Sequence, residues 1–179
     1  MKTLFAEHKI DYDGSILKPL YAYIQHRLAG DSIVSFIGAC DVSLEHMIDA
    51  EDFVVSAQIK SDHMLHFIVE IFAQNLMTAV SLQRLLVAIA QSILPPGLIR
   101  RGDDLYFGSK KLSVSIASVS AVSAQIHLGL NIKNDGTPVP TCSLEDLKVD
   151  IKKFAQELMK KFSEEYVSIV EATQKVHPL

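Results

Sequence analysis

Residues 101–119 read RGDDLYFGSKKLSVSIASV, and residues 125–132 read QIHLGLNI. Apolar residues occupy alternate positions from 112 to 117 and from 126 to 132, which is the pattern of half-buried β-strands. If the two strands pair as a hairpin through 120–123, we expect their apolar positions to share one face of the sheet. The opposite face would then carry small or polar residues and one lysine: Lys111, Ser113, Ser115, Ala117, Gln125, His127, Gly129 and Asn131.

A sheet face made of serine, glycine and amide side chains leaves room for another group. We therefore predict a small-molecule site there, with ligand-binding contributions from Ser113, Ser115, His127, Gly129 and Asn131. Two other interpretations stay open. The polar face could be solvated, as in many antiparallel sheets, or its small residues could admit a closely packed helix.

The rest of the chain predicts an α+β fold. Residues 32–40 and 63–72 have strand patterns, and helical spacing of apolar residues predicts a helix around 17–28. A long apolar helix is expected over 75–94, because Pro95 and Pro96 cannot continue it. Ser143 and Asp146 predict the start of the last helix, since they resemble a capping box. Strands in series between helices indicate a mixed or antiparallel central sheet flanked by helices.

The composition fits a single domain spanning residues 1–179, because 49% of the residues are hydrophobic and can build a sizeable core. The formal net charge of -4 gives no long-range attraction to nucleic acid or to a membrane surface. The apolar stretch 76–94 contains polar residues and an arginine, so a membrane span is a poor fit. Cys40 and Cys142 lack the spacing of a thiolate metal site, and reduced thiols lead us to expect a cytoplasmic protein.

The two quoted stretches resemble the central segment of the biotin and lipoate protein ligases, which have a class II synthetase-like fold. That family has a Trp-Pro-Asn-Asp-Leu motif, then a basic-Lys-Leu-Ala-Gly strand, then a Gly-Ile-Asn strand. Here Asp103-Asp104-Leu105 stands at the Asn-Asp-Leu position, Lys111 at the family lysine, and Gly129-Leu130-Asn131 at the later strand. The strand 64–72 and the helix 75–94 also follow the family's order. An uncharacterised prokaryotic family of this fold is more similar still.

The resemblance implies a reaction on a small carboxylic acid, which the family activates as an acyl-adenylate before passing it to an acceptor protein. ATP and Mg²⁺ are the cofactors that it implies, and Lys111 is the residue that would contact the acid and the phosphate. A fixed ammonium group lowers the barrier because negative charge develops during the attack on phosphorus. Asp103 and Asp104 become candidate ligand-binding residues by the same resemblance. The other interpretation of Lys111 is a surface lysine beside Lys110.

Two departures from the family concern the nucleotide. A glycine- and arginine-rich loop should precede strand 64–72, but residues 56–62 read SAQIKSD, with no glycine and one lysine. The sequence therefore gives no ground to expect the backbone amides of a glycine-rich loop at the phosphates. Asp103 replaces the asparagine of the motif, and its carboxylate would repel a phosphate.

Two further groups of titratable residues suggest a chemical role. His66 and Glu70 have the same strand parity, so they are candidate catalytic residues that exchange protons with a bound group; a hydrogen-bonded structural pair is the alternative. Glu45, Asp49 and Asp52 would align on one helix face, and together with Asp41 they could hold Mg²⁺. A solvated acidic surface is the preferred interpretation, so no metal site is predicted.

Three classes of function follow. The first is a ligase or acyltransferase that acts on a small carboxylic acid or its activated form, with Lys111 orienting the acid. The second is a non-catalytic or regulatory protein that binds a small ligand in the same sheet pocket. The third is a scaffold whose pocket is vestigial. A homodimer is compatible with each of the three.

Overall fold

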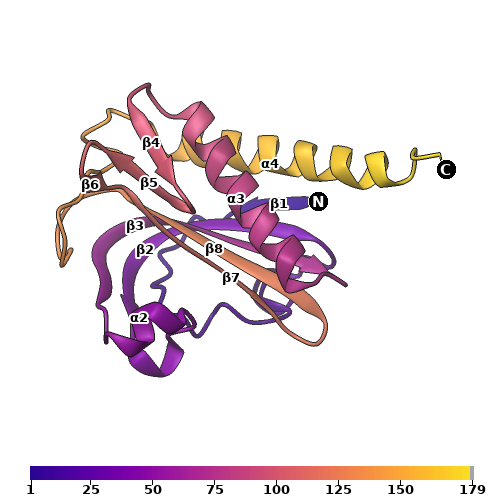
Figure 1. Cartoon of the computed structure of the whole chain (residues 1–179), viewed down its shortest axis with the longest axis horizontal. Coiled ribbons are helices and arrows are strands. Elements are labelled where there is room, and N and C mark those ends of the chain that lie inside the picture. The colour runs from indigo at the N-terminus through magenta and orange to yellow at the C-terminus, as the bar shows by residue number, and fades with distance from the viewer. Residues whose placement is uncertain (178–179) are drawn as a thin grey trace.

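The computed structural model describes residues 1–177, and its centre is a five-stranded sheet with the strand order β1-β2-β3-β8-β7 (Figure 1). β1 runs parallel to β2, and every other neighbouring pair is antiparallel. The sheet is therefore mixed and the fold is α+β, as predicted. Its strands are β1 (Lys2–Phe5), β2 (Ser32–Val42), β3 (Ile59–Phe72), β7 (Ser113–Val119) and β8 (Ser123–Asn131).

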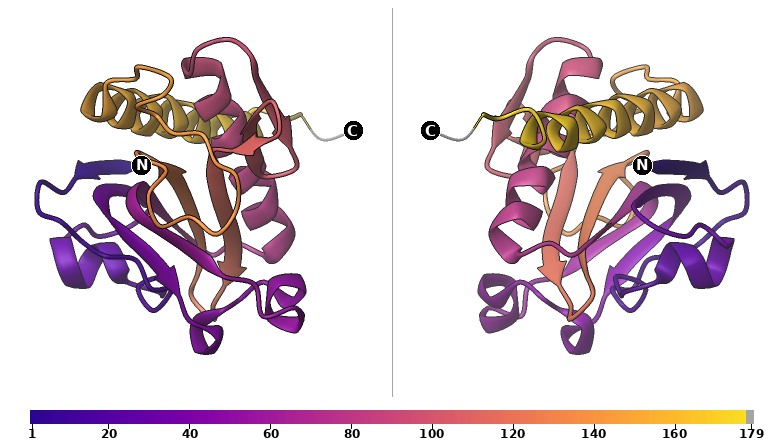
Figure 2. Two further views of the ribbon diagram at one scale, coloured as in Figure 1. Left: turned by 90° about the vertical axis from the view of Figure 1, so that its left-hand side faces the viewer. Right: turned by 90° about the vertical axis from the view of Figure 1, so that its right-hand side faces the viewer.

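Two long helices, α3 (Leu76–Ile93) and α4 (Ile151–Thr173), cover one face of this sheet (Figures 1 and 2). Asn75 caps α3 by accepting a hydrogen bond from the backbone N–H of Thr78 at 2.9 Å, and the helix ends just before Pro95. α3 is the one helix in the described part of the chain that is long and apolar enough to cross a membrane. Here it packs on β7, β8 and α4, and its buried stripe includes Leu86 and Val87.

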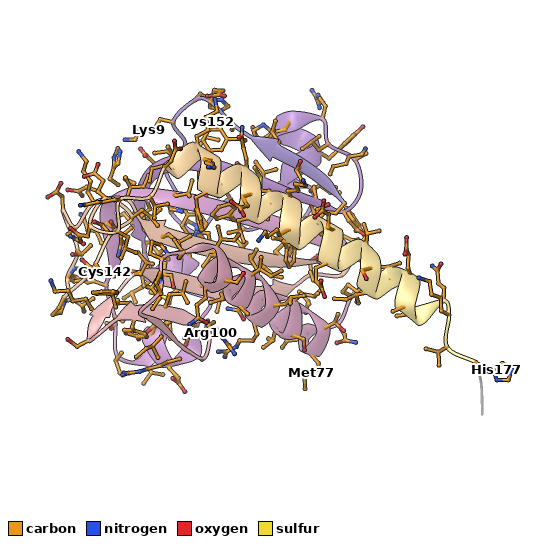
Figure 3. The ribbon with its side chains drawn as sticks, turned by 90° about the horizontal axis from the view of Figure 1, so that it is seen from above. Lys9, Met77, Arg100, Cys142, Lys152 and His177 are labelled. Carbon is orange, nitrogen blue, oxygen red and sulfur yellow. The ribbon has the colours of Figure 1, made fainter. Side chains whose placement is uncertain are left out.

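The last helix begins later than predicted. Ser143 and Asp146 do form the reciprocal hydrogen bonds of a capping box, at 3.0 and 3.2 Å. These bonds close only a turn, because Lys148 has a positive φ of 56° that no α-helix can continue. Asp150 is the actual cap of α4, and it accepts from the backbone N–H of Lys153. Figure 3 shows α4 lying beside α3, with its last turns extending past the rest of the molecule.

The N-terminal segment covers part of the other face of the sheet. Its helix α1 (Tyr21–His26) is shorter than the predicted 17–28, because Leu20 and Arg27 both have positive φ angles and bound it at each end. Tyr12, Leu17 and Tyr21 from this segment pack against Phe36 and Ile68 of the sheet. A second connection on this side contains the single turn η1 (Leu44–His46) and the short helix α2 (Ala50–Val54).

A small three-stranded sheet adjoins α3 and β7. It consists of β4 (Leu98–Arg101), β5 (Asp104–Phe107) and β6 (Lys110–Lys111), joined as antiparallel hairpins. Gly102 and Gly108 have the positive φ angles that these tight turns require. The backbone of Leu112 then connects β6 to β7, so the small sheet fixes the point at which the central sheet receives Lys111.

The β7–β8 hairpin forms as predicted, but its faces differ from the prediction. Ser115 lies opposite Leu128, and Ile116 lies opposite His127. Opposed residues of antiparallel strands project to the same side, so the serines of β7 share the helix face with the leucines of β8. The expected union of the two apolar faces was therefore wrong. β7 is an edge strand whose two faces are both partly buried, so its alternation does not identify the core side.

Candidate functional site

A cavity of about 420 Å³ opens on the sheet face that is opposite α3 and α4. Its floor comes from β2, β3, β7 and β8, with Cys40, Met64, Val114, Ile116 and His127 among the lining residues. The rest of the lining comes from residues within 46–52, from residues 57–61, from the turn at 103–104 and from residues within 137–141. The cavity thus lies where a small-molecule site was predicted, although part of its lining differs.

Lys111 lies at the wall of the cavity, where β6 passes into β7. Its Nζ is 2.9 Å from Asp104 Oδ2, and its side chain is 30% exposed. Burial works to lower the pKa of Lys111, but the hydrogen bond and the charge of Asp104 outweigh it, so the pKa is raised. The side chain is therefore a protonated, positioned ammonium group at the cavity and not a free surface lysine.

The two aspartates of the 103–104 turn have different partners. Asp103 is held from α3, because Gln83 Nε2 donates to its Oδ2 at 2.8 Å and Arg84 forms an ion pair with its Oδ1 at 3.2 Å. Asp104 faces Lys111 on the neighbouring strand, and burial raises the pKa of its carboxyl despite this cation. Both residues line the cavity, so the turn contributes negative charge as well as support for Lys111.

His127 lines the floor of the cavity and is joined to a second buried histidine. His66 Nδ1 and His127 Nε2 are 3.0 Å apart, and His66 Nε2 lies 3.4 Å from the carbonyl oxygen of Gly38. Tyr12 stacks on His127 with ring centroids 3.8 Å apart. Burial lowers the pKa of His66 to about 4 and lowers the pKa of His127 well below its usual range, so both rings are neutral near pH 7.

The predicted catalytic pair of His66 and Glu70 does not form. Glu70 Oε1 accepts hydrogen bonds from the backbone N–H of Leu20 at 2.6 Å and from Ser123 Oγ at 2.7 Å, near the other end of the sheet. Neither His66 nor Glu70 lines the cavity. Equal parity placed them on one face, but four residues along a strand separate their Cα atoms by ~13 Å.

Gly129 is also absent from the cavity lining. A Cβ atom at this position would lie 2.9 Å from Met64 Cε and 3.3 Å from both His127 Cε1 and Val114 Cγ2. The space above Gly129 is thus filled by its neighbours and is not available to a ligand. Because Gly129 has no side chain, Met64, His127 and Val114 can pack closely against its backbone.

The remaining predicted residues border the cavity with their polar groups already engaged. The Ser113 hydroxyl accepts from the Leu105 N–H, and the Ser115 hydroxyl donates to the carbonyl oxygen of His127. Asn131 Nδ2 donates to the carbonyl oxygens of Lys111 and Cys142 at 3.3 and 3.4 Å, which ties β8 to the strand that carries the lysine. These three side chains position the wall around Lys111.

The charge around the cavity is mostly negative. Its lining contains the carboxylates of Asp49, Glu51, Asp52, Asp103 and Asp104 but only the ammonium groups of Lys60 and Lys111. Within residues 1–177, no three His, Cys, Asp or Glu side chains converge on a point that could hold a metal ion. The acidic run does not form one helix face either: Asp49 caps α2, and Asp41 forms an ion pair with Lys60.

Several cavity residues carried no sequence signal. Tyr12 reaches the sheet from a long N-terminal segment through a bridge to Cys40, which no local pattern predicts. Ser61 also lines the cavity, and its buried Oγ has no hydrogen-bond partner in the described chain. Phe53, Val54 and Val55 have exposed apolar side chains and lie on and just after α2. In the sequence they stand between the lining residues within 46–52 and those within 57–61.

Solved structures of biotin and lipoate protein ligases have the same fold. A mutant of the biotin protein ligase from Aquifex aeolicus, in complex with biotin, has a TM-score of 0.60 at 13% identity over 96% of this chain and 72% of that chain. Lipoate-protein ligase A bound with ATP has a TM-score of 0.56 at 15% identity over 92% of this chain and 85% of that chain. At these identities the likeness concerns the fold alone.

Two relatives extend over the whole chain. A protein of unknown function from Pyrococcus horikoshi has a TM-score of 0.95 at 39% identity over 99% of this chain and 98% of that chain. The uncharacterized protein MJ0805 of Methanocaldococcus jannaschii is also 39% identical, over 100% of this chain and 86% of its own length. The model of the family described as Domain of unknown function (DUF366) matches residues 1–177. The chain therefore belongs to the DUF366 family.

Proposed function

We propose that this protein binds a small carboxylic acid, or its activated acyl form, in the cavity beside Lys111 and transfers the acyl group. The observation that carries this proposal is the position of Lys111, whose ammonium group is protonated, partly shielded and held at the cavity by Asp104. Biotin protein ligase, which shares the fold, was solved in complex with biotin, itself a small carboxylic acid. The likeness in fold supports a comparable class of ligand.

An already activated acyl form, such as a thioester, fits this cavity better than ATP does. Two solved proteins of this fold bind ATP, but here five carboxylates face two ammonium groups around the cavity. Such a lining repels a triphosphate, with its several negative charges, more strongly than a single carboxylate or an uncharged thioester. Residues 56–62 also contain no glycine to present backbone amides to phosphates. ATP and Mg²⁺ therefore have no part in the proposed transfer.

In the proposed transfer, an acceptor amine or thiol attacks the carbonyl carbon of the acyl group. The new bond to carbon forms while the bond to the leaving thiolate breaks, and the proton of the nucleophile passes to that thiolate. Lys111 would donate a hydrogen bond to the carbonyl oxygen, where negative charge develops. The acceptor is proposed to be a protein, as in ligases of this fold class.

One observation favours a second candidate, a binding protein without catalysis. The two titratable residues that were expected to move protons, His66 and Glu70, lie outside the cavity lining. The alternative protein would use Lys111 only to hold the carboxylate. Release of thiol from an octanoyl thioester in the presence of a general amine acceptor distinguishes the two: turnover supports the enzyme, and tight binding without turnover supports the binding protein.

Calorimetric titration with octanoate tests whether the protein binds a small carboxylic acid through Lys111. The wild type should bind octanoate, Lys111→Met should weaken binding at least tenfold, and Lys110→Met should leave it unchanged. Lys110 is the matched control because it is adjacent, exposed and absent from the cavity lining. Binding that is the same in all three proteins would overturn the role of Lys111. Addition of ATP with Mg²⁺ should not strengthen binding; if it does so tenfold, adenylation replaces acyl transfer.

A further inference from the structure

The tautomers of the two buried histidines follow from their hydrogen bonds. A backbone carbonyl only accepts, so the Nε2 of His66 that faces the Gly38 oxygen must carry a proton. Because the ring is neutral, its Nδ1 is then bare and accepts from His127 Nε2 at 3.0 Å. His127 therefore carries its single proton on Nε2, and its own Nδ1 has a free lone pair. His66 acts as a positioning residue that sets this state.

The Nδ1 of His127 is reached from the cavity. It has no hydrogen-bond partner among the described residues. The fully buried side-chain polar atoms without a partner are Tyr21 Oη, His26 Nε2, Ser32 Oγ and Ser61 Oγ. Because His127 Nδ1 is not one of them, part of its surface is accessible. His127 itself lines the cavity, as does Ser61. Ser61 Oγ is fully buried, so the accessible unused acceptor in the floor of the cavity is the Nδ1 of His127. The opposite tautomer would direct a bare Nε2 of His66 at a carbonyl oxygen, which is repulsive.

We infer that His127 Nδ1 is a fixed hydrogen-bond acceptor that selects ligands with an N–H or O–H donor at the end remote from their carboxylate. The inference rests on the proposed function for the position of the carboxylate at Lys111. Asn131 donates a hydrogen bond to the carbonyl oxygen of Lys111, and it is four residues from His127 on β8. The Cα atoms of Asn131 and His127 are therefore ~13 Å apart. An extended medium-chain acid has a length of this order, so a molecule with its carboxylate at Lys111 would extend along β8 toward His127. The substrate class is thus a medium-chain acid with a donor near its far end.

The tautomer is measured directly by long-range proton–nitrogen correlation spectra of the intact protein labelled with nitrogen-15 in histidine. We expect both rings in the Nε2–H form at neutral pH. In His66→Phe the acceptor for His127 Nε2 is gone, and we expect a mixture of tautomers for His127. A wild-type His127 in the Nδ1–H form would present a donor to the cavity and would overturn the inference, whatever the ligand is.

Ligand selection is tested by titrating the wild type and His127→Gln with octanoate and with ω-hydroxyoctanoate. The amide nitrogen of glutamine can take the place of Nε2 and still donate to His66, while the acceptor at Nδ1 is lost. We expect the hydroxy acid to bind the wild type about fivefold tighter than octanoate, and the two acids to bind His127→Gln equally.

The outcomes separate the inference from the proposed function. If both acids bind the wild type with equal affinity and require Lys111, the selection by His127 is refuted while the proposed function stands. If neither acid binds, the proposed function fails and with it the inferred substrate class, and the tautomer spectra decide whether His127 presents an acceptor. The comparison of the two acids on the wild type does not depend on the folding of any variant.

Discussion

Lys111 Nζ lies 2.9 Å from Asp104 Oδ2, and the two residues stand on adjacent strands of the small sheet, β6 and β5. Both side chains are less than one third exposed. The pair therefore fixes an ammonium group at the cavity, and it also makes each partner dependent on the other. Removal of either one leaves a partly buried charge without its counter-ion.

The stability of the pair can be measured with a double-mutant cycle. Lys111→Met and Asp104→Asn should each lower the free energy of unfolding by about 1–2 kcal/mol, and the double variant should recover part of that loss. Urea denaturation of the four proteins gives the coupling energy, which we expect to be about 1 kcal/mol. Lys110→Met should change stability by less than about 0.5 kcal/mol. Strictly additive losses would mean that the pair is not coupled.

Acid should destabilise the fold through the buried histidines. The pKa of His66 is about 4 in the folded protein and near 6.5 when unfolded, so the unfolded chain binds more protons between these values. The contribution of His66 to the free energy of unfolding, roughly 3 kcal/mol, is therefore present above pH 6.5 and is lost as the pH drops toward 4. Burial lowers the pKa of His127 as well, so it adds to this loss in the same direction. Asp11, Tyr12 and Cys40 are the other titratable groups around the pair.

Urea denaturation between pH 7 and pH 4 measures this dependence. His127→Gln removes one of the two rings and should flatten the curve, whereas His8→Gln, which replaces an exposed histidine that only neighbours His26, should change it far less. Stability that stays constant over this range in the wild type would contradict the burial of the two rings in their neutral form.

Gly38 should tolerate a side chain far less well than Gly129 does. A Cβ atom on Gly38 would collide with the backbone carbonyl of Ile10, which runs beside β2 at this point, whereas on Gly129 it would meet the flexible end of Met64 at 2.9 Å. Backbone cannot move aside as a methionine can. We expect Gly38→Ala to cost more than about 3 kcal/mol and Gly129→Ala about 1 kcal/mol in thermal or urea unfolding. Equal costs would place the N-terminal segment elsewhere.

The cap of α2 should control local opening at the cavity. Asp49 accepts from the backbone N–H groups of Glu51 and Asp52, and α2 buries no side chain. Asp49→Ala should therefore speed hydrogen exchange in Ala50–Val54 by a factor that corresponds to about 1 kcal/mol, with little effect on global unfolding. Asp150→Ala is the matched cap variant on the well-buried α4 and should lower global stability instead. A similar global loss in both variants would show that α2 is part of the core.

The sequence predicts the elements better than it predicts their contacts. The prolines after Leu94 end α3 where expected, and the hairpin around Gly108 delivers Lys111 to the cavity together with Asn131. The faces of β7 were wrong because an edge strand that packs on both sides shows alternation without a unique core side. His66 and Glu70 share parity but not proximity. Tyr12 comes from a distant segment, and only the tertiary structure places its ring on His127.

A crystal structure of the protein with octanoate would show whether Lys111 holds the carboxylate of the acid. We expect the carboxylate within hydrogen-bonding distance of Lys111 Nζ, at about 2.7–3.2 Å, and the alkyl chain running along β8 toward His127. Octanoate bound with its carboxylate away from Lys111, or a cavity that stays free of the acid at saturating concentration, would refute the proposed role of Lys111.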